Sequence, residues 1–158
     1  MRVGIGYDSH RFTSKEGERK LILGGVDIPY ARGLEGWSDA DAVAHALTDA
    51  VLGAAGLGDI GRLFPAHDPR FRNANSIDLL KKAAVKAVES GHAPQQVDVT
   101  VILEAPKLAP YVAQMEEILA AALMVAPSAV SVKAKTNEGM GWIGRGEGVA
   151  VMAVALLG

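Results

Sequence analysis

Apolar residues follow two kinds of pattern along the chain, and each kind predicts a different element. Short runs that alternate with period two, or are apolar throughout, are typical of β-strands. Longer segments in which apolar residues recur every three or four positions are typical of amphipathic helices. The predicted strands span residues 2–7, 21–23, 26–28, 97–103, 130–136 and 149–157, and the predicted helices span residues 38–55, 76–90 and 111–125.

The order of these elements predicts an α+β fold, in which a mixed β-sheet is covered by three helices. The length favours a single domain over residues 1–158. Several strands, including the last, are apolar on both faces, and three helices are too few to cover them. We therefore expect part of the sheet to be buried against another copy of the chain.

Glycines and capping residues add local expectations. Gly4 and Gly6 interrupt the first predicted strand, where glycine usually marks a bulge or the close approach of another backbone. Ser38 is a natural N-cap for the first helix, and Asp41 in the first turn favours the helix dipole. The polar segment 13–20 predicts a hairpin loop.

Composition narrows the classes of function. Hydrophobic residues make up 49% of the chain and charged residues 22%, which predicts a packed core. The formal net charge of −2 gives no broad attraction to nucleic acid or anionic lipid. An anionic substrate must therefore be bound by individual groups at its site. The absence of cysteine excludes disulfides and thiolate metal sites. No apolar run approaches the ~20 residues of a membrane span, and no signal peptide is recognisable, so we expect a cytoplasmic protein.

The strongest candidate for chemistry combines the end of the first strand with the start of the first helix. Asp8 and His10 are two residues apart and share one face of a strand, and His45 lies early in the helix. Two imidazoles and one carboxylate suit a catalytic zinc with an open position. Asp41 and Asp49 are each four residues from His45, and a carboxylate there can fix its tautomer. The alternative is a surface aspartate, a capping histidine and a core histidine.

The second candidate is the glycine-rich segment 136–148. Glycines let backbone N–H groups approach phosphate oxygens, and the carboxylate of Glu138 suits a Mg²⁺ ion that bridges phosphates. The alternative is a tight connection that needs positive φ angles. The segment matches neither a P-loop nor a Rossmann fingerprint, and no serine or cysteine nucleophile motif is present. His67 and His92 are expected on the surface.

Taken together, the residues resemble the 2-C-methyl-D-erythritol 2,4-cyclodiphosphate synthase family of the non-mevalonate isoprenoid pathway, essentially from end to end. The matching segments are Gly6-Tyr7-Asp8-Ser9-His10, Ser38-Asp39-Ala40-Asp41 with His45, Thr48-Asp49-Ala50, Gly58-Asp59-Ile60-Gly61 with Leu63-Phe64-Pro65, Ala105-Pro106-Lys107-Leu108 and Gly144-Arg145-Gly146-Glu147-Gly148.

The resemblance implies an enzyme that converts 4-diphosphocytidyl-2-C-methyl-D-erythritol 2-phosphate into the cyclic diphosphate and releases CMP. It implies zinc on Asp8, His10 and His45, and Mg²⁺ or Mn²⁺ on Glu138 between two substrate phosphates. It also implies a homotrimer with active sites between subunits, in which the sheets pack together. Family members can hold an isoprenoid diphosphate on the threefold axis.

The same resemblance assigns residues to three parts of the site. Ser38 and residues 59–61, with Phe64 and Pro65 nearby, would line an erythritol-phosphate pocket. Residues 103–109 and 135–138 would bind the cytidine diphosphate, and Trp142 and Arg145 would lie near the threefold axis. Thr136 and Trp37 occupy the positions with catalytic roles. The implied substrate-binding residues are Asp8, Ser9, His10, Trp37, Ser38, Asp59, Ile60, Gly61, Phe64, Pro65, Asp68, Leu103, Glu104, Ala105, Pro106, Lys107, Leu108, Ala109, Lys135, Thr136, Asn137, Glu138, Trp142 and Arg145.

The chain departs from the family pattern at Trp37 and at Ala66-His67. Trp37 stands where the family usually has a histidine that assists the transition state. Indole donates one hydrogen bond but cannot carry a proton, so we expect Trp37 to cover the pocket. Ala66-His67 replaces a usual Asp-Thr. Two other functions stay open: a zinc hydrolase of phosphoesters, with Asp41 or Asp59 as base, and a non-enzymatic trimer that binds isoprenoid diphosphates.

Overall fold

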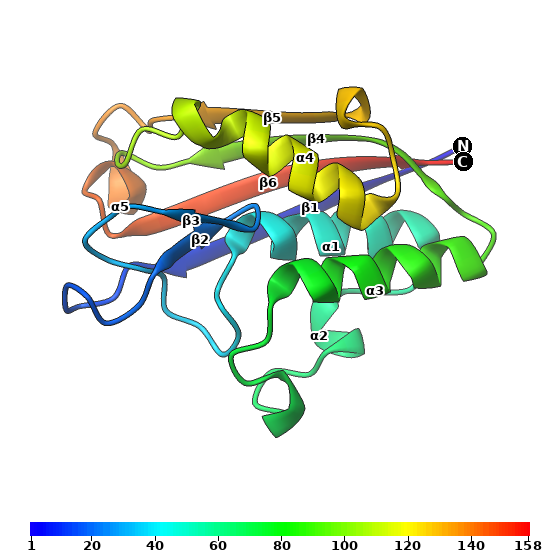
Figure 1. Cartoon of the computed structure of the whole chain (residues 1–158), viewed down its shortest axis with the longest axis horizontal. Coiled ribbons are helices and arrows are strands. Elements are labelled where there is room, and N and C mark those ends of the chain that lie inside the picture. The colour runs from blue at the N-terminus through cyan, green and yellow to red at the C-terminus, as the bar shows by residue number, and fades with distance from the viewer.

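A computed structural model describes residues 1–158 and contains one four-stranded sheet and a separate hairpin (Figure 1). In the large sheet the strand order is β1-β6-β4-β5, with β4 and β5 parallel and the other neighbours antiparallel. The hairpin pairs β2 with β3. The strands are β1 (Arg2–Arg11), β2 (Leu21–Leu23), β3 (Val26–Ile28), β4 (Pro94–Ile102), β5 (Val130–Lys135) and β6 (Gly148–Leu157).

Helices cover one face of the sheet (Figure 1). The three long helices are α1 (Ala42–Ala55), α3 (Ser76–Glu89) and α4 (Val112–Leu123), and the two short ones are α2 (Ile60–Leu63) and α5 (Gly141–Gly144). Helix α1 lies between the sheet and α3, which is why it is rich in alanine and buried around most of its circumference. No helix has the length and apolar character that a membrane crossing requires.

The two glycines of β1 let α1 lie directly on the strand. A methyl group at Gly6 would overlap the carbonyl oxygen of Ala46, and one at Gly4 would overlap that of Ala50. The expectation that these glycines mark close backbone approach is therefore confirmed. Asp8 and His10 continue the same face of β1 by the period-two rule, so they lie where α1 begins.

The predicted mixed sheet and its three long helices are confirmed, but three local expectations are wrong. The first helix is capped by Asp41 rather than Ser38, because the Asp41 carboxylate accepts from the N–H groups of Val43 and Ala44. Segment 13–20 does not connect the two strands of a hairpin, because β1 pairs with β6, the last strand in the sequence. Two single-turn helices, α2 and α5, lie in segments where the sequence predicts no helix.

The sheet face opposite the helices is apolar and exposed. Ile5 is 74% exposed, Tyr7 53%, Met152 50% and Val154 42%. Ile5 is paired with Val154 and Tyr7 with Met152 across β1 and β6, so the four side chains form one continuous patch. Exposed patches of this kind mark interaction surfaces.

We predict that Gly6→Ala destabilises the protein by about 3 kcal/mol or more, because the methyl group forces α1 away from β1. Chemical denaturation measures this loss. Gly53→Ala is the matched control: Gly53 lies exposed within α1 with no atom near its missing methyl group. That change should stabilise by roughly 0.5–1 kcal/mol. Equal stability of the two variants would contradict the close-approach argument.

Candidate metal centre and active site

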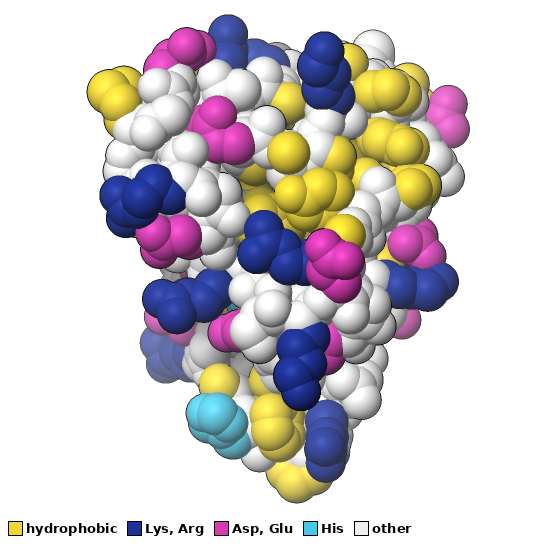
Figure 2. Space-filling view, turned by 90° about the vertical axis from the view of Figure 1, so that its left-hand side faces the viewer, with side chains coloured by type: hydrophobic (Ala, Val, Ile, Leu, Met, Phe, Trp, Pro, Cys, Tyr) yellow, Lys and Arg dark blue, Asp and Glu magenta, His cyan; other side chains and the backbone are white.

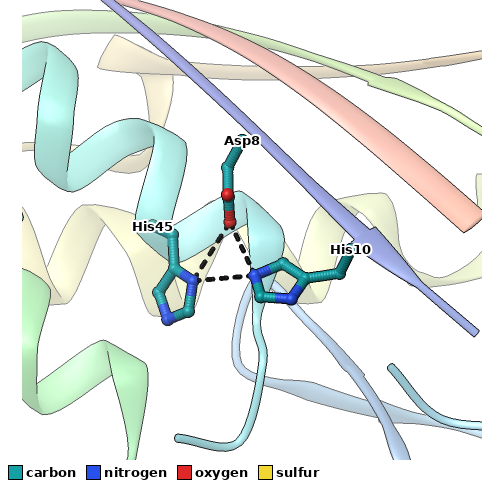
Figure 3. A group of neighbouring side chains, drawn as sticks. All are labelled: Asp8, His10 and His45. Atoms are coloured by element: carbon teal, nitrogen blue, oxygen red, sulfur yellow. Dashed lines mark hydrogen bonds and ion pairs between the residues drawn. The ribbon is translucent and has the colours of Figure 1, made fainter. Parts of the chain in front are cut away.

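Three side chains from two elements converge at the end of β1 (Figure 3). The Asp8 Oδ2 atom lies 2.9 Å from His10 Nε2 and 3.1 Å from His45 Nδ1. The two imidazole nitrogens are 3.2 Å apart. Three electron-pair donors therefore face one point, and only a cation, either a metal ion or protons, can satisfy them together.

Each imidazole uses its other ring nitrogen outside the cluster. His10 Nδ1 lies 2.6 Å from the backbone oxygen of Glu35, which can only accept, so this nitrogen carries the proton. His45 Nε2 lies 2.8 Å from the hydroxyl of Ser76 and 3.1 Å from that of Ser38. Such outer partners orient a ligand and leave the inner nitrogen free for a metal.

The charges within the cluster reinforce one another. Burial alone would raise the pKa of Asp8, but hydrogen bonds and charges from His10 and His45 outweigh it and lower the pKa to about 2. Burial acts to lower the pKa of His10, but the Asp8 carboxylate outweighs it and raises that pKa. Asp8 is therefore an anion at neutral pH, as a metal ligand must be.

A cavity of about 220 Å³ opens beside the cluster. It brings together residues of β1, α1, α2 and the loop after α2. All of the residues predicted for the erythritol-phosphate pocket line it except Asp59. Asp68, which is also among the implied substrate-binding residues, does not line it. The lining residues are Asp8, His10, Trp37, Ser38, His45, Ile60, Gly61, Phe64, Pro65, Ala66, Phe71 and Leu79.

Trp37 forms a wall of this cavity. Its indole N–H donates to the backbone oxygen of Asp68 at 2.9 Å, so its one hydrogen bond is already made. Its ring meets the exposed His67 edge-on, with centroids 5.3 Å apart, and the Arg72 guanidinium lies 5.8 Å from the ring centroid. The contact joins Trp37 to His67, two of the three residues at which the sequence departs from the family pattern.

Residues predicted for the cytidine diphosphate lie around a second cavity of about 200 Å³, which shares no residue with the first. Glu104 ties its two sides together, because its Oε1 atom accepts from the N–H of Asn137 at 2.8 Å. The lining residues are Leu103, Glu104, Pro106, Lys107, Leu108, Ala109, Ala134, Lys135 and Thr136.

Glu138 lies just beyond this second cavity in a left-handed conformation with φ +52. Its exposed carboxylate accepts from the Thr136 hydroxyl at 3.0 Å, and it is not part of the three-residue cluster. Ser9 and Trp142 lie in a third hollow beside His10. Arg145 is close by in sequence and donates to Glu147 at 2.7 Å.

Sequence reasoning named the wrong partners for His45. The Asp41 carboxylate accepts from Gly24 and Gly25 as well as from the helix start, and the Asp49 carboxylate accepts from the N–H of Ile60 at 2.7 Å. Ser76 holds His45 instead. In the sequence it is only the first residue of a predicted helix, and no spacing along the chain links it to His45.

The face of the molecule at the left-hand side of Figure 1 carries mixed charge. Figure 2 shows Lys and Arg side chains interspersed with Asp and Glu, and hydrophobic side chains gathered in the upper part of this face. This agrees with the small net charge of −2. Binding of an anion on this face therefore depends on individual groups rather than on a broad basic field.

A mixed sheet and a helix that bring two histidines and a carboxylate together beside a cavity form the arrangement of a metal-dependent enzyme. The model of the YgbB family matches residues 1–158, and the chain belongs to this family. It is 54% identical over 157 residues to the 2-C-methyl-D-erythritol 2,4-cyclodiphosphate synthase of Symbiobacterium thermophilum, covering 99% of this chain and 98% of that protein.

Solved structures give the same relationship. A 2C-methyl-D-erythritol-2,4-cyclodiphosphate synthase in a CDP-bound form matches with a TM-score of 0.89 and 39% identity, over 99% of this chain and all of that one. The bifunctional IspDF of Campylobacter jejuni matches with a TM-score of 0.93 and 44% identity. The match covers 99% of this chain and 42% of that longer protein.

We predict that zinc affinity falls as the pH is lowered from about 8 to 5.5. Zinc needs neutral imidazoles, and because Asp8 raises the pKa of His10, protons compete at a higher pH than at an isolated histidine. Below that pKa, the proton on His10 should cost about tenfold in affinity per pH unit. Competition with a chelator measures it. His92→Gln, outside the cluster, should keep the same profile, and a flat profile in the wild type would contradict the assignment.

Proposed function

We propose that this chain converts 4-diphosphocytidyl-2-C-methyl-D-erythritol 2-phosphate into 2-C-methyl-D-erythritol 2,4-cyclodiphosphate and CMP. The observation that carries the proposal is the Asp8–His10–His45 cluster beside a cavity, in a chain 54% identical to a synthase of this name over almost its whole length. The CDP-bound state of a structural relative supports a cytidine nucleotide as part of the substrate.

The cluster fits zinc by its donor set, since two imidazole nitrogens and one carboxylate oxygen lie within 4.8 Å of one another. Asp8, His10 and His45 would hold it, leaving a position for a phosphate oxygen. Glu138 offers a single carboxylate, which suits Mg²⁺ or Mn²⁺ that takes its remaining ligands from water and phosphates. The two ions supply Lewis-acid neutralisation of phosphate charge when bound.

The protein's own residues perform positioning. The substrate carries its nucleophile, the 2-phosphate, so a phosphate oxygen attacks the β-phosphorus while the bond to the α-phosphate oxygen breaks and CMP leaves. Intramolecular attack gains from fixed orientation, and no side-chain nucleophile is needed. Ser38 and the apolar wall of Phe64 and Pro65 would hold the erythritol phosphate and exclude water that would hydrolyse it.

The cytidine diphosphate would occupy the second cavity, between the loop at 103–109 and the end of β5. Backbone groups of these strand ends, with Lys107 and Lys135, offer donors to the pyrimidine and the diphosphate. Thr136, which already donates to Glu138, is placed to orient phosphate beside the second metal. We propose Trp37 as a wall rather than a phosphate donor, because its N–H is occupied.

The hydrolase alternative requires a carboxylate that can take a proton from water. Asp41 is fully buried and its oxygens accept from four backbone N–H groups, so it does not serve. Asp59 is exposed, although one of its oxygens accepts from Arg62. Asp59 is therefore the remaining base for that alternative.

We predict CMP release and a cyclic product when purified protein is given the diphosphocytidyl substrate with zinc and magnesium. His45→Ala should lower turnover by more than the roughly 10–100-fold that loss of an outer ligand partner costs. Phosphorus NMR identifies the product, and His92→Ala is the matched control. Linear phosphates alone would favour the hydrolase. Binding of isoprenoid diphosphate without any turnover would favour the non-enzymatic trimer.

We further propose a homotrimer with active sites between subunits. The exposed apolar patch of Ile5, Tyr7, Met152 and Val154 supports burial of the sheet face against other copies. The division of the predicted site into two cavities supports sharing, because one copy can offer the metal cluster and its neighbour the nucleotide pocket. Trp142 and Arg145 would then lie near the threefold axis, where an isoprenoid diphosphate could bind.

We predict that Val154→Asp converts the trimer to single chains and abolishes turnover, because it places a charge in the buried interface. Light scattering after size exclusion measures the mass. Val85→Asp is the matched control, since Val85 is 39% exposed on α3 and Val154 is 42% exposed on the sheet. A wild-type protein of one-chain mass would contradict the trimer.

A further inference from the structure

The outer nitrogen of His45 contacts hydroxyl groups rather than a carbonyl. Ser76 Oγ lies 2.8 Å and Ser38 Oγ 3.1 Å from His45 Nε2. A hydroxyl can donate or accept, so by itself it does not fix which imidazole nitrogen carries the proton. His10 has no such ambiguity, because its outer nitrogen faces the backbone oxygen of Glu35.

A carboxylate behind Ser76 removes the ambiguity. Asp39 accepts from the backbone N–H of Ser76 at 3.0 Å and also from the Ser76 hydroxyl. It accepts further from the N–H of Asp41 at 3.2 Å, so three donors converge on it. The single hydroxyl proton of Ser76 is thus directed at Asp39, and the lone pairs of Ser76 are left to face His45.

We propose that Asp39 and Ser76 are positioning residues that keep a proton on His45 Nε2, so that Nδ1, which faces Asp8 in the metal-free cluster, is the nitrogen that binds a metal. The proposal rests on the proposed function, in which the cluster binds a metal, and it adds which residues orient His45. Ser76 is fully buried and Asp39 partly so, which strengthens their hydrogen bonds by excluding competing water. The direction of donation runs from His45 to Ser76 to Asp39.

The same direction decides what Ser38 can do. Its oxygen accepts from the N–H of Ala40 at 3.2 Å and from His45. Its own proton is therefore left to point toward Ser76, 3.3 Å away, or into the cavity that Ser38 lines. Ser38 becomes a donor to an anionic ligand only while His45 keeps its proton on Nε2.

The chain of contacts also joins distant elements. Ser76 is the first residue of α3, and Asp39 lies in the segment before α1, where its N–H donates to the backbone oxygen of Ala74 at 3.1 Å. A merely structural role would therefore be to fasten α3 to the start of α1. The decisive experiment must measure which nitrogen of the His45 imidazole carries the proton, and not only the stability of the fold.

We expect nitrogen NMR of the metal-free protein to show His45 protonated on Nε2, and Ser76→Ala to give a mixture of both tautomers because Ser38 alone fixes no direction. Zinc affinity, measured against a chelator, should fall roughly 10–100-fold. Thr48→Ala is the matched control: Thr48 is a buried hydroxyl on α1 that bonds only to the oxygen of Ala44, at 2.7 Å. It should leave the tautomer and zinc affinity unchanged.

Asp39→Asn tests the carboxylate in a residue of the same shape, and it too should yield mixed tautomers and weaker zinc binding. The proposal is overturned if Ser76→Ala and Asp39→Asn fold and keep both the Nε2 proton and wild-type zinc affinity. It is equally overturned if both variants are destabilised while the His45 tautomer is unchanged. A wild type that binds no zinc and releases no CMP would refute the proposed function, while the tautomer measurement would still decide the proposal on Asp39 and Ser76.

Discussion

The direct contact between the backbones of β1 and α1 is the constraint on which the site depends. Gly4 and Gly6 leave no side chain on the helix-facing side of the strand, so α1 approaches until its carbonyl oxygens meet the strand. Two residues farther along the same face lies Asp8, and then His10. With an ordinary side chain in place of Gly6, the start of α1 would move outward and carry His45 away from both.

Electrostatic interactions within the Asp8–His10–His45 cluster add to the effect of packing α1 on β1. A carboxylate and two imidazoles are expensive to bury separately, but each stabilises the other: the histidines lower the pKa of Asp8, and Asp8 raises that of His10. The outer ring nitrogens of His10 and His45 contact Glu35 and Ser76. The cluster is therefore ordered before a metal arrives, which reduces the cost of binding one.

The bare side of the sheet and the divided cavities point to the same organisation. One face of β1 and β6 is covered by α1, while the other exposes apolar side chains that a single chain leaves in water. The Asp8–His10–His45 cluster and the proposed nucleotide pocket lie in separate cavities of one chain. Association of copies through this face of the sheet would bury the exposed apolar side chains and would bring the cavity of one copy beside that of another. One interface would then serve both stability and function.

The sequence by itself determined what regular spacing encodes. Period two placed Asp8 and His10 on one face of a strand, and the glycines before them predicted a bulge or the close approach of another backbone, which the structure identifies as α1. The tertiary structure alone decided that Ser76 rather than Asp41 holds His45. Helix spacing brings residues four apart onto one face, but the competing demand of backbone N–H groups at the helix start claimed Asp41. Ser76 reaches His45 only because α3 packs beside α1, and no local pattern records that contact.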